Sequence, residues 1–203
     1  MAYALQPDMR PVPPWLKRTV ALGAVVIAIL VLGLVNHARR VPPLLVLSGP
    51  HHQMEYPRAV ERLIASARRR IWMSMFVVHL DGSDGPVSVL MQSLADAAGR
   101  GVHVQVCLDL GSTFGTHEVD PKHERPFEWL RTHGVHVLVD EPDRTSHAKV
   151  LIIDDARVVI GSHNWTRDAL TGNREASVLM EDAAAARGLS DLLRTVPGWD
   201  ADY

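Results

Sequence analysis

The residues that could do chemistry, judged by type and spacing, lie in one stretch of the chain, residues 146–180. His147 and Lys149 stand two residues apart at the start of an apolar run, and Asp154 follows five residues later. Residues two apart in a β-strand point to the same face, so an imidazole and an ammonium would lie side by side. Such a pair suits a phosphate group.

A second polar pair follows the next apolar run. Ser162 and Asn164 come directly after Gly161 and add neutral hydrogen-bond donors, which could reach the same anion if the two strands are neighbours. Taken singly, each residue is ordinary, because a histidine at a strand start is usually structural and Gly-Ser-x-Asn is a common turn. The joint pattern His-x-Lys-x4-Asp-x6-Gly-Ser-x-Asn is different, since six residue types at fixed spacing seldom coincide by chance.

This pattern resembles the phospholipase D superfamily, also called the HKD family. The resemblance extends over roughly residues 44–194 and includes the segments AVERLIASARRRIWMSMFVV, LADAAGRGVHVQVCLDL and NWTRDALTGNREASV. The layout is similar to that of the small single-motif members, among them the bacterial endonuclease Nuc and the mitochondrial cardiolipin hydrolase. The resemblance implies phosphodiesterase activity and a phospholipase D-like α/β/α sandwich with a central mixed sheet.

The resemblance also implies roles for individual residues. His147 would be the nucleophile that attacks phosphorus and forms a phosphohistidine, which divides one difficult displacement into two easier ones. Glu175 matches a family carboxylate that accepts a hydrogen bond from this imidazole and orients it. The family mechanism needs a second histidine as general acid, and no second His-x-Lys occurs in the chain. We therefore expect a homodimer whose twofold axis brings both copies of His147 to one phosphate.

Three further residues would hold the phosphate. Lys149 and Asn164 match the family residues that bind the non-bridging oxygens and stabilise the developing negative charge, and Ser162 would assist them. Asp154 belongs to the named motif, yet we expect it to be more structural than chemical. We expect no cofactor and no metal, because the single cysteine, Cys107, excludes a cysteine-based zinc site and the chain has no HExxH motif.

Charge and composition narrow the choice of substrate without fixing it. Residues 41–203 contain 16 basic and 22 acidic residues, a formal charge of −6. The domain therefore lacks the net positive charge typical of nucleic-acid binding, although a local basic groove is compatible with this balance. Cys107 lies in an apolar run at 102–110, and we expect it to be a buried strand residue.

An uncharged apolar run at 19–35 predicts a membrane anchor. As a helix, its 17 residues would be about 25 Å long, and basic residues flank it on both sides, as expected near lipid headgroups. The competing interpretations are a cleaved signal peptide, although no A-x-A-like cleavage site follows, and a buried helix of the domain. Three basic residues precede the run and two follow it, a small asymmetry that favours an extracytoplasmic catalytic domain.

From residue 44 onwards, strand patterns alternate with helical patterns, which predicts an α/β domain. We expect strands at 44–47, 71–78, 102–110, 135–140, 148–153, 157–160 and 176–180, and helices at 56–70, 86–100, 127–132 and 183–194. The expected organisation is an N-terminal segment 1–18, a transmembrane anchor 19–35, a linker 36–43, a catalytic domain 44–195 and a C-terminal tail 196–203. The loop 111–126 is expected to border the cleft and influence substrate choice.

The sequence therefore predicts a single-pass membrane protein that hydrolyses phospholipid phosphodiester bonds. The anchor and the negative domain charge favour phospholipid as the substrate. The single-motif layout also fits an endonuclease that cleaves DNA or RNA, which is the alternative. A non-catalytic phosphate-binding membrane protein is a more remote alternative, because His147, Lys149, Asn164 and Glu175 are all intact.

Overall fold

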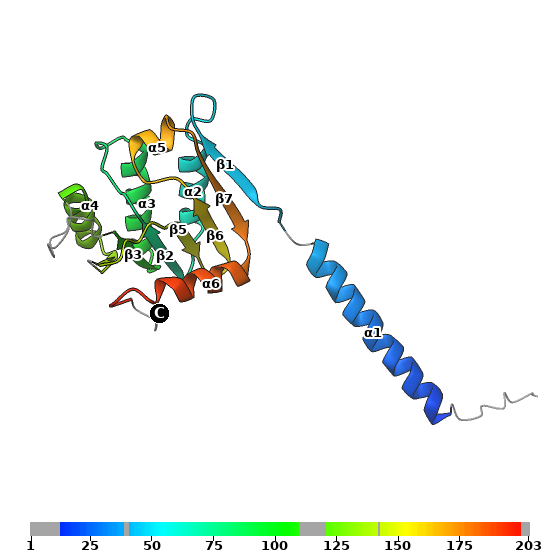
Figure 1. Ribbon diagram of the computed structural model, residues 1–203. Coiled ribbons are helices and arrows are strands. Elements are labelled where there is room, and N and C mark those ends of the chain that lie inside the picture. Colours follow the sequence, from blue (N-terminus) through cyan, green and yellow to red (C-terminus); the bar gives the residue numbers. More distant parts are fainter. Residues whose placement is uncertain (1–12, 39–40, 110–120, 142, 200–203) are drawn as a thin grey trace, which may run out of the picture. The chain divides into compact units, whose positions relative to one another are not determined.

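The computed structural model describes residues 13–38, 41–109, 121–141 and 143–199. The chain divides into two compact units, Met1–Val41 and Pro42–Tyr203. Figure 1 labels most of their helices and strands. Most of the predicted 111–126 loop, and parts of the N-terminal segment, the linker and the C-terminal tail, lie outside the described residues.

The first unit contains one long helix, α1 (Pro14–Ala38), which extends beyond the predicted 19–35 run at both ends. Its large apolar side chains are exposed within the unit; they are Leu22, Val25, Val26, Ile27, Ile29, Leu30, Val31 and Leu32. In the part of the chain that the structure describes, no helix has both the length and the apolar character that a membrane crossing requires. The transmembrane anchor therefore stays a prediction.

A seven-stranded sheet forms the centre of the second unit, in the order β1-β7-β6-β5-β2-β3-β4. The strands are β1 (Leu44–Ser48), β2 (Arg70–Met75), β3 (His103–Leu108), β4 (His136–Val139), β5 (Lys149–Ile153), β6 (Arg157–Gly161) and β7 (Glu175–Glu181). Strands β2, β3 and β4 are mutually parallel, and the other pairs are antiparallel. The predicted central mixed sheet is confirmed.

Helices cover both faces of this sheet (Figure 1). They are α2 (Glu55–Ala65), α3 (Pro86–Gly99), α4 (Pro121–Thr132), α5 (Arg167–Thr171) and α6 (Ala183–Leu193). Successive residues of β5 serve two cores, because side chains alternate across a strand. Leu151 belongs to the larger core under α2 and α3, whereas Ile152 packs with Trp72, Cys107 and Leu193 in the smaller core under α6. Cys107 is buried, as predicted.

Helix α2 ends at Ala65, well before the predicted end at residue 70. The backbone N–H groups of Arg68, Arg69 and Arg70 donate to the carboxylate of Asp154 instead of continuing the helix, at 2.8–3.2 Å. A side chain more than eighty residues away thus terminates the helix. Local periodicity could not predict this.

Helix α4 starts at Pro121, inside the segment predicted to be a loop. Proline is tolerated in the first turn of a helix, where its missing N–H would have no intrahelical partner, so Pro121 can begin the helix. A second proline, Pro126, lies inside it and weakens the helical pattern. The short helix α5 was also not predicted; Thr166 caps it by accepting a hydrogen bond from the Ala169 N–H at 3.3 Å.

Candidate active site

One edge of the sheet gathers the residues of the predicted site. Strand β5 begins there at Lys149, and because β5 is antiparallel to β2 and β6, the carboxyl ends of those strands lie beside its start. Strand β7 begins at the same edge with Glu175, since Gly161 at the end of β6 pairs with Ser177. His147 precedes β5. The sheet order therefore brings the His-x-Lys pair, the Gly-Ser-x-Asn segment and Glu175 together.

His147 and Lys149 are in direct contact at this edge. Lys149 Nζ lies 3.3 Å from both ring nitrogens of the exposed His147 and donates to its carbonyl oxygen at 2.8 Å. The Phe76 ring lies 4.3 Å from the imidazole, centroid to centroid, and Lys149 Nζ is 4.6 Å from the Phe76 centroid. Phe76 thus supports both groups through a ring contact and a cation–π interaction. The predicted pairing of imidazole and ammonium is confirmed.

The charge of Lys149 is tuned by its surroundings. Burial lowers the pKa of the Lys149 ammonium, and the carboxylates of Glu175 and Asp109 oppose this shift. Glu175 is therefore within electrostatic reach of Lys149. In the described part of the chain, the hydrogen bond of its carboxylate is from Asn173 Nδ2 at 3.4 Å, and none joins it to His147. The orienting role of Glu175 stays a prediction.

In the Gly-Ser-x-Asn segment, the side chain of His163 is buried in the core. His163 stacks on Tyr56, with ring centroids 4.1 Å apart, and its Nδ1 lies 2.7 Å from Ser177 Oγ. Burial lowers the pKa of His163 to about 4, although the charge of Glu175 opposes the shift, so its imidazole is neutral near pH 7. Alternate residues of an extended segment point in opposite directions. Ser162 and Asn164 consequently face away from Tyr56.

A backbone hydrogen bond of the next residue, Trp165, places Asn164 beyond the start of β5. The Trp165 N–H donates to the Val77 carbonyl at 2.9 Å, which joins the continuation of β6 to the continuation of β2. The Oδ1 atom of Asn164 is buried and has no hydrogen-bond partner among the described residues. By contrast, Ser162 Oγ already accepts from the Ala176 N–H at 3.1 Å and donates to the Ala176 carbonyl at 3.3 Å. Asn164 is thus the freer of these two side chains, and it would bind a phosphate through its Nδ2 donor, because the Oδ1 atom can only accept.

Asp154 lies at the other end of β5. Its carboxylate accepts three backbone N–H bonds from the turn after α2 and one from Arg157 Nη2 at 2.9 Å. Burial raises the pKa of this carboxyl, but those hydrogen bonds and the Arg157 charge outweigh it and hold the pKa below its usual value. β5 contains five residues at about 3.3 Å each, so Asp154 is on the order of 15 Å from Lys149. The structure does not bring it to the site.

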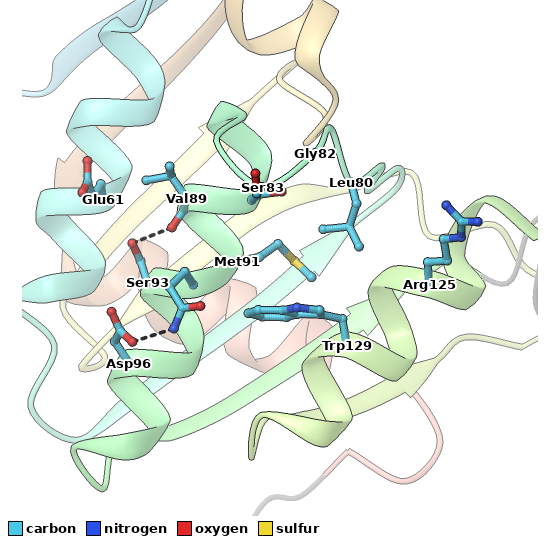
Figure 2. A pocket seen from close by; sticks show the side chains of 12 residues that line it. Glu61, Leu80, Gly82, Ser83, Val89, Met91, Ser93, Asp96, Arg125 and Trp129 are labelled. Atoms are coloured by element: carbon cyan, nitrogen blue, oxygen red, sulfur yellow. Dashed lines mark hydrogen bonds between the residues drawn. The ribbon is translucent and has the colours of Figure 1, made fainter.

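Two cavities differ in their relation to these residues. The larger, of about 640 Å³, lies between α3, α4 and the loop after β2, and none of the predicted site residues lines it. Figure 2 shows Met91 of α3 and Trp129 of α4 facing each other across it. The smaller, of about 250 Å³, is bordered by His147, by Arg144, and by Leu192 and Val196 at the end of α6. Only the smaller cavity adjoins the candidate nucleophile.

A seven-stranded mixed sheet that presents His147, Lys149 and the Gly-Ser-x-Asn segment at one edge defines a phospholipase D-like domain. Residues 60–195 match the family described as "Cardiolipin synthase, PLD-like domain", and the chain belongs to this family of the phospholipase D superfamily. The resemblance inferred from the sequence is thereby confirmed.

Relatives and a solved structure agree with this assignment. The chain is 32% identical over 123 residues to a phospholipase D of Rickettsia bellii, covering 61% of this chain and 54% of that protein. It is 30% identical over 146 residues to the mitochondrial cardiolipin hydrolase of Mus musculus, covering 69% and 57%. The chain thus spans little more than half the length of these relatives. The crystal structure of Nuc from Salmonella typhimurium, at 23% identity, has a TM-score of 0.62 over 80% of this chain and 99% of Nuc, which shows a shared fold.

Three residues beside the site were not predicted to belong to it: Phe76, Asp109 and Asp140. Phe76 falls within a continuous apolar run, where nothing distinguishes it from core residues. Asp109 and Asp140 did carry a signal, because each is an acidic residue directly after an apolar strand, in VCLD and VLVD. An acidic residue at a strand end is a candidate for binding backbone N–H groups or for lining a site at the sheet edge.

Proposed function

We propose that the protein is a phospholipase D-type phosphodiesterase that hydrolyses phospholipid phosphodiester bonds with His147 as nucleophile. The observation that carries this proposal is the contact of the Lys149 ammonium with both ring nitrogens of an exposed His147, 3.3 Å from each. A phosphate that reaches His147 would meet the cation in the same place. The family assignment adds support, since its named members include a phospholipase D and a cardiolipin hydrolase.

The proposed reaction has two displacements. An imidazole nitrogen of His147 attacks phosphorus, the bond from phosphorus to the leaving alcohol oxygen breaks, and a general acid protonates that oxygen. Water then attacks the phosphohistidine, the P–N bond breaks, and the water proton passes to the group that acted as acid. Lys149 and Asn164 stabilise the charge on the non-bridging oxygens in both steps.

The general acid is proposed to be His147 of a second copy. The chain has one His-x-Lys pair, and His147 is exposed at an edge of the sheet, where a twofold axis could bring two copies to one phosphate. If the site is shared, a heterodimer of wild-type and His147→Ala chains lacks one of its two histidines. Activity of co-expressed mixtures should then fall with the square of the wild-type fraction. A linear fall, or full activity of a monomer in sedimentation analysis, would contradict a shared site.

Phospholipid is the proposed substrate on three grounds. Residues 41–203 carry a formal charge of −6, which disfavours a polyanionic strand. The cavity beside His147 is lined by apolar Leu192, Leu193 and Val196 and by acidic Asp140 and Glu141, and no aromatic side chain of the described residues lines it. The described lining therefore offers no stacking platform for a base. The third ground is the proposed anchoring of residues 19–35 in a membrane, which would hold the site near lipid.

Membrane anchoring has its own test. Full-length protein should float with liposomes and resist extraction at alkaline pH, whereas protein lacking residues 1–40 should not. Release of the full-length chain by alkaline extraction would show that residues 19–35 do not anchor it.

An endonuclease is the second candidate function. Nuc is built on the same fold, and the chain aligns with 99% of it. The deciding experiment presents the full-length protein in mixed micelles with phospholipids and, separately, with single- and double-stranded DNA and RNA, without added metal. His147→Ala is the control. Products from lipid that the variant does not form would support the proposal, products from nucleic acid alone would favour the endonuclease, and no turnover of either would leave a non-catalytic phosphate-binding protein.

A further inference from the structure

The segment that leads to His147 is a crossover between β4 and β5, and its described residues, 140, 141 and 143–148, form no helix or strand. The chain leaves the edge strand β4 at Val139 and enters β5 at Lys149. Since the strand order is β5-β2-β3-β4, the connection must pass the ends of β2 and β3 on its way. Such a connection lacks the regular backbone hydrogen bonds that would fix the position of His147. Contacts with the sheet must therefore fix it.

Two carboxylates hold this crossover one residue before His147. The Ser146 N–H donates to Asp140 Oδ2 at 2.7 Å and to Asp109 Oδ1 at 3.0 Å. Asp109 directly follows β3 and Asp140 directly follows β4, and the pairing of Leu108 with Val139 places the two aspartates side by side. Their exposures are 3% and 7%. Hydrogen bonds from an N–H to a carboxylate are roughly twice as strong as those between neutral groups.

The backbone of Asp109 is itself anchored by a histidine of α4. His123 Nε2 accepts a hydrogen bond from the Val78 N–H at 3.3 Å, so its proton resides on Nδ1. Nδ1 then donates to the Asp109 carbonyl at 2.6 Å. The imidazole is fully buried and links the continuation of β2 to the end of β3. His123 therefore holds the backbone of Asp109, whose carboxylate binds Ser146, in place at the end of β3.

Asp109 also acts on the site through its charge. The carboxylates of Glu175 and Asp109 both favour the charged form of the Lys149 ammonium, although burial lowers its pKa overall. The same ammonium contacts the imidazole and carbonyl of His147 and the Phe76 ring. Asp109 thus combines a hydrogen bond to the crossover with a charge that acts on Lys149.

We propose that Asp109 and Asp140 are positioning residues that fix the crossover, and with it His147, through the shared Ser146 N–H. This inference rests on the proposed function for its effect on turnover, since it concerns the placement of the proposed nucleophile. Neither carboxylate is assigned to touch the substrate. Their effect passes through Ser146.

The activity test compares four variants of the full-length protein. Asp109→Ala and Asp140→Ala should each lower kcat by about 10²-fold, the size of loss expected when a reacting group is displaced by about 1 Å. Asp109→Asn and Asp140→Asn keep an acceptor for the Ser146 N–H and should lose less.

A second readout does not depend on turnover. Hydrogen exchange of the Ser146 amide should accelerate in Asp109→Ala and Asp140→Ala but not in Asp182→Asn, a control that changes a carboxylate capping α6. Unchanged exchange at Ser146 would overturn the positioning role. If the wild-type protein turned over neither lipid nor nucleic acid, the proposed function would fail, while the exchange measurement alone would still decide whether the carboxylates hold the crossover.

Discussion

Strand β5 carries residues of one sequence motif at both of its ends, and the two ends differ in chemistry. Before its first residue, His147 is exposed and contacts Lys149, whose ammonium has one backbone acceptor and is open to further partners. After its last residue, the Asp154 carboxylate is filled by three backbone N–H groups and a guanidinium. Groups with spare bonding capacity can bind a ligand, whereas groups with filled capacity hold a fold together.

Residues of one sequence motif can therefore differ in role, with ligand-binding groups at one end of the strand and structural groups at the other. Asp154 and Asp155 also have positive φ values of 51° and 61°, a left-handed conformation that aspartate tolerates better than most residues. The aspartate of the motif therefore sets the turn from β5 to β6 and the end of α2. We expect substitutions at the His147 end to abolish activity without changing stability. Substitutions of Asp154 should lower the free energy of unfolding and leave the activity of the folded protein unchanged.

The largest effect is expected at His147. His147→Ala should lower kcat/KM by more than about 10⁴-fold, because it removes the proposed nucleophile and, in a dimer, the general acid as well. Its exposed side chain predicts a change in unfolding free energy within about 0.5 kcal/mol. Steady-state kinetics and urea unfolding of the same preparation measure both. Substantial residual activity of His147→Ala would show that another residue is the nucleophile.

Lys149→Gln should reduce kcat by about 10²- to 10³-fold, the range seen when one donor to a developing anion is removed. The active form is the ammonium, and burial lowers its pKa despite the opposing charges of Glu175 and Asp109. Activity of the wild-type protein should therefore decline on the alkaline side at a lower pH than an ordinary lysine would cause. A rate profile that stays flat through this range would show that the charge of Lys149 is not required.

Asp154→Ala should destabilise the domain by about 1–2 kcal/mol, since the backbone N–H groups of the turn after α2 and Arg157 lose their shared acceptor. Asp154→Asn keeps an acceptor and should cost less. The folded pKa of Asp154 is lowered, so its stabilisation is complete above the usual aspartate range and disappears as the pH falls below it. Urea unfolding should consequently show a smaller gap between wild type and Asp154→Asn at pH 3 than at pH 7. An equal gap would contradict this assignment.

The smallest effect is expected at Ser162. Its hydroxyl is already shared with the backbone of Ala176, so Ser162→Ala should cost about 1 kcal/mol of stability and less than about tenfold in kcat. A loss comparable to that of Lys149→Gln would instead make Ser162 a principal phosphate ligand. The same kinetic and unfolding assays distinguish the two results.

The sequence predicted the parts of the fold that depend on local pattern. Apolar runs and the glycines that end helices located the strands and α3, and the spacing of His147, Lys149, Ser162 and Asn164 located the site. It did not predict where α2 ends, because the cause is Asp154, far away in the chain. Nor did it identify the support of His147 by Phe76, since an aromatic residue in an apolar run resembles any core residue until the sheet order is known.

The central claim is that the reactive end of the motif forms a covalent bond to phosphorus at His147. The most direct measurement is a rapid mix of full-length protein with substrate that carries radioactive phosphorus, stopped at alkaline pH and followed by peptide mapping. We predict label on the peptide that contains His147 in the wild-type protein and in Asp154→Asn, and none in His147→Ala. Label on another peptide, or turnover without any labelled peptide, would contradict the account.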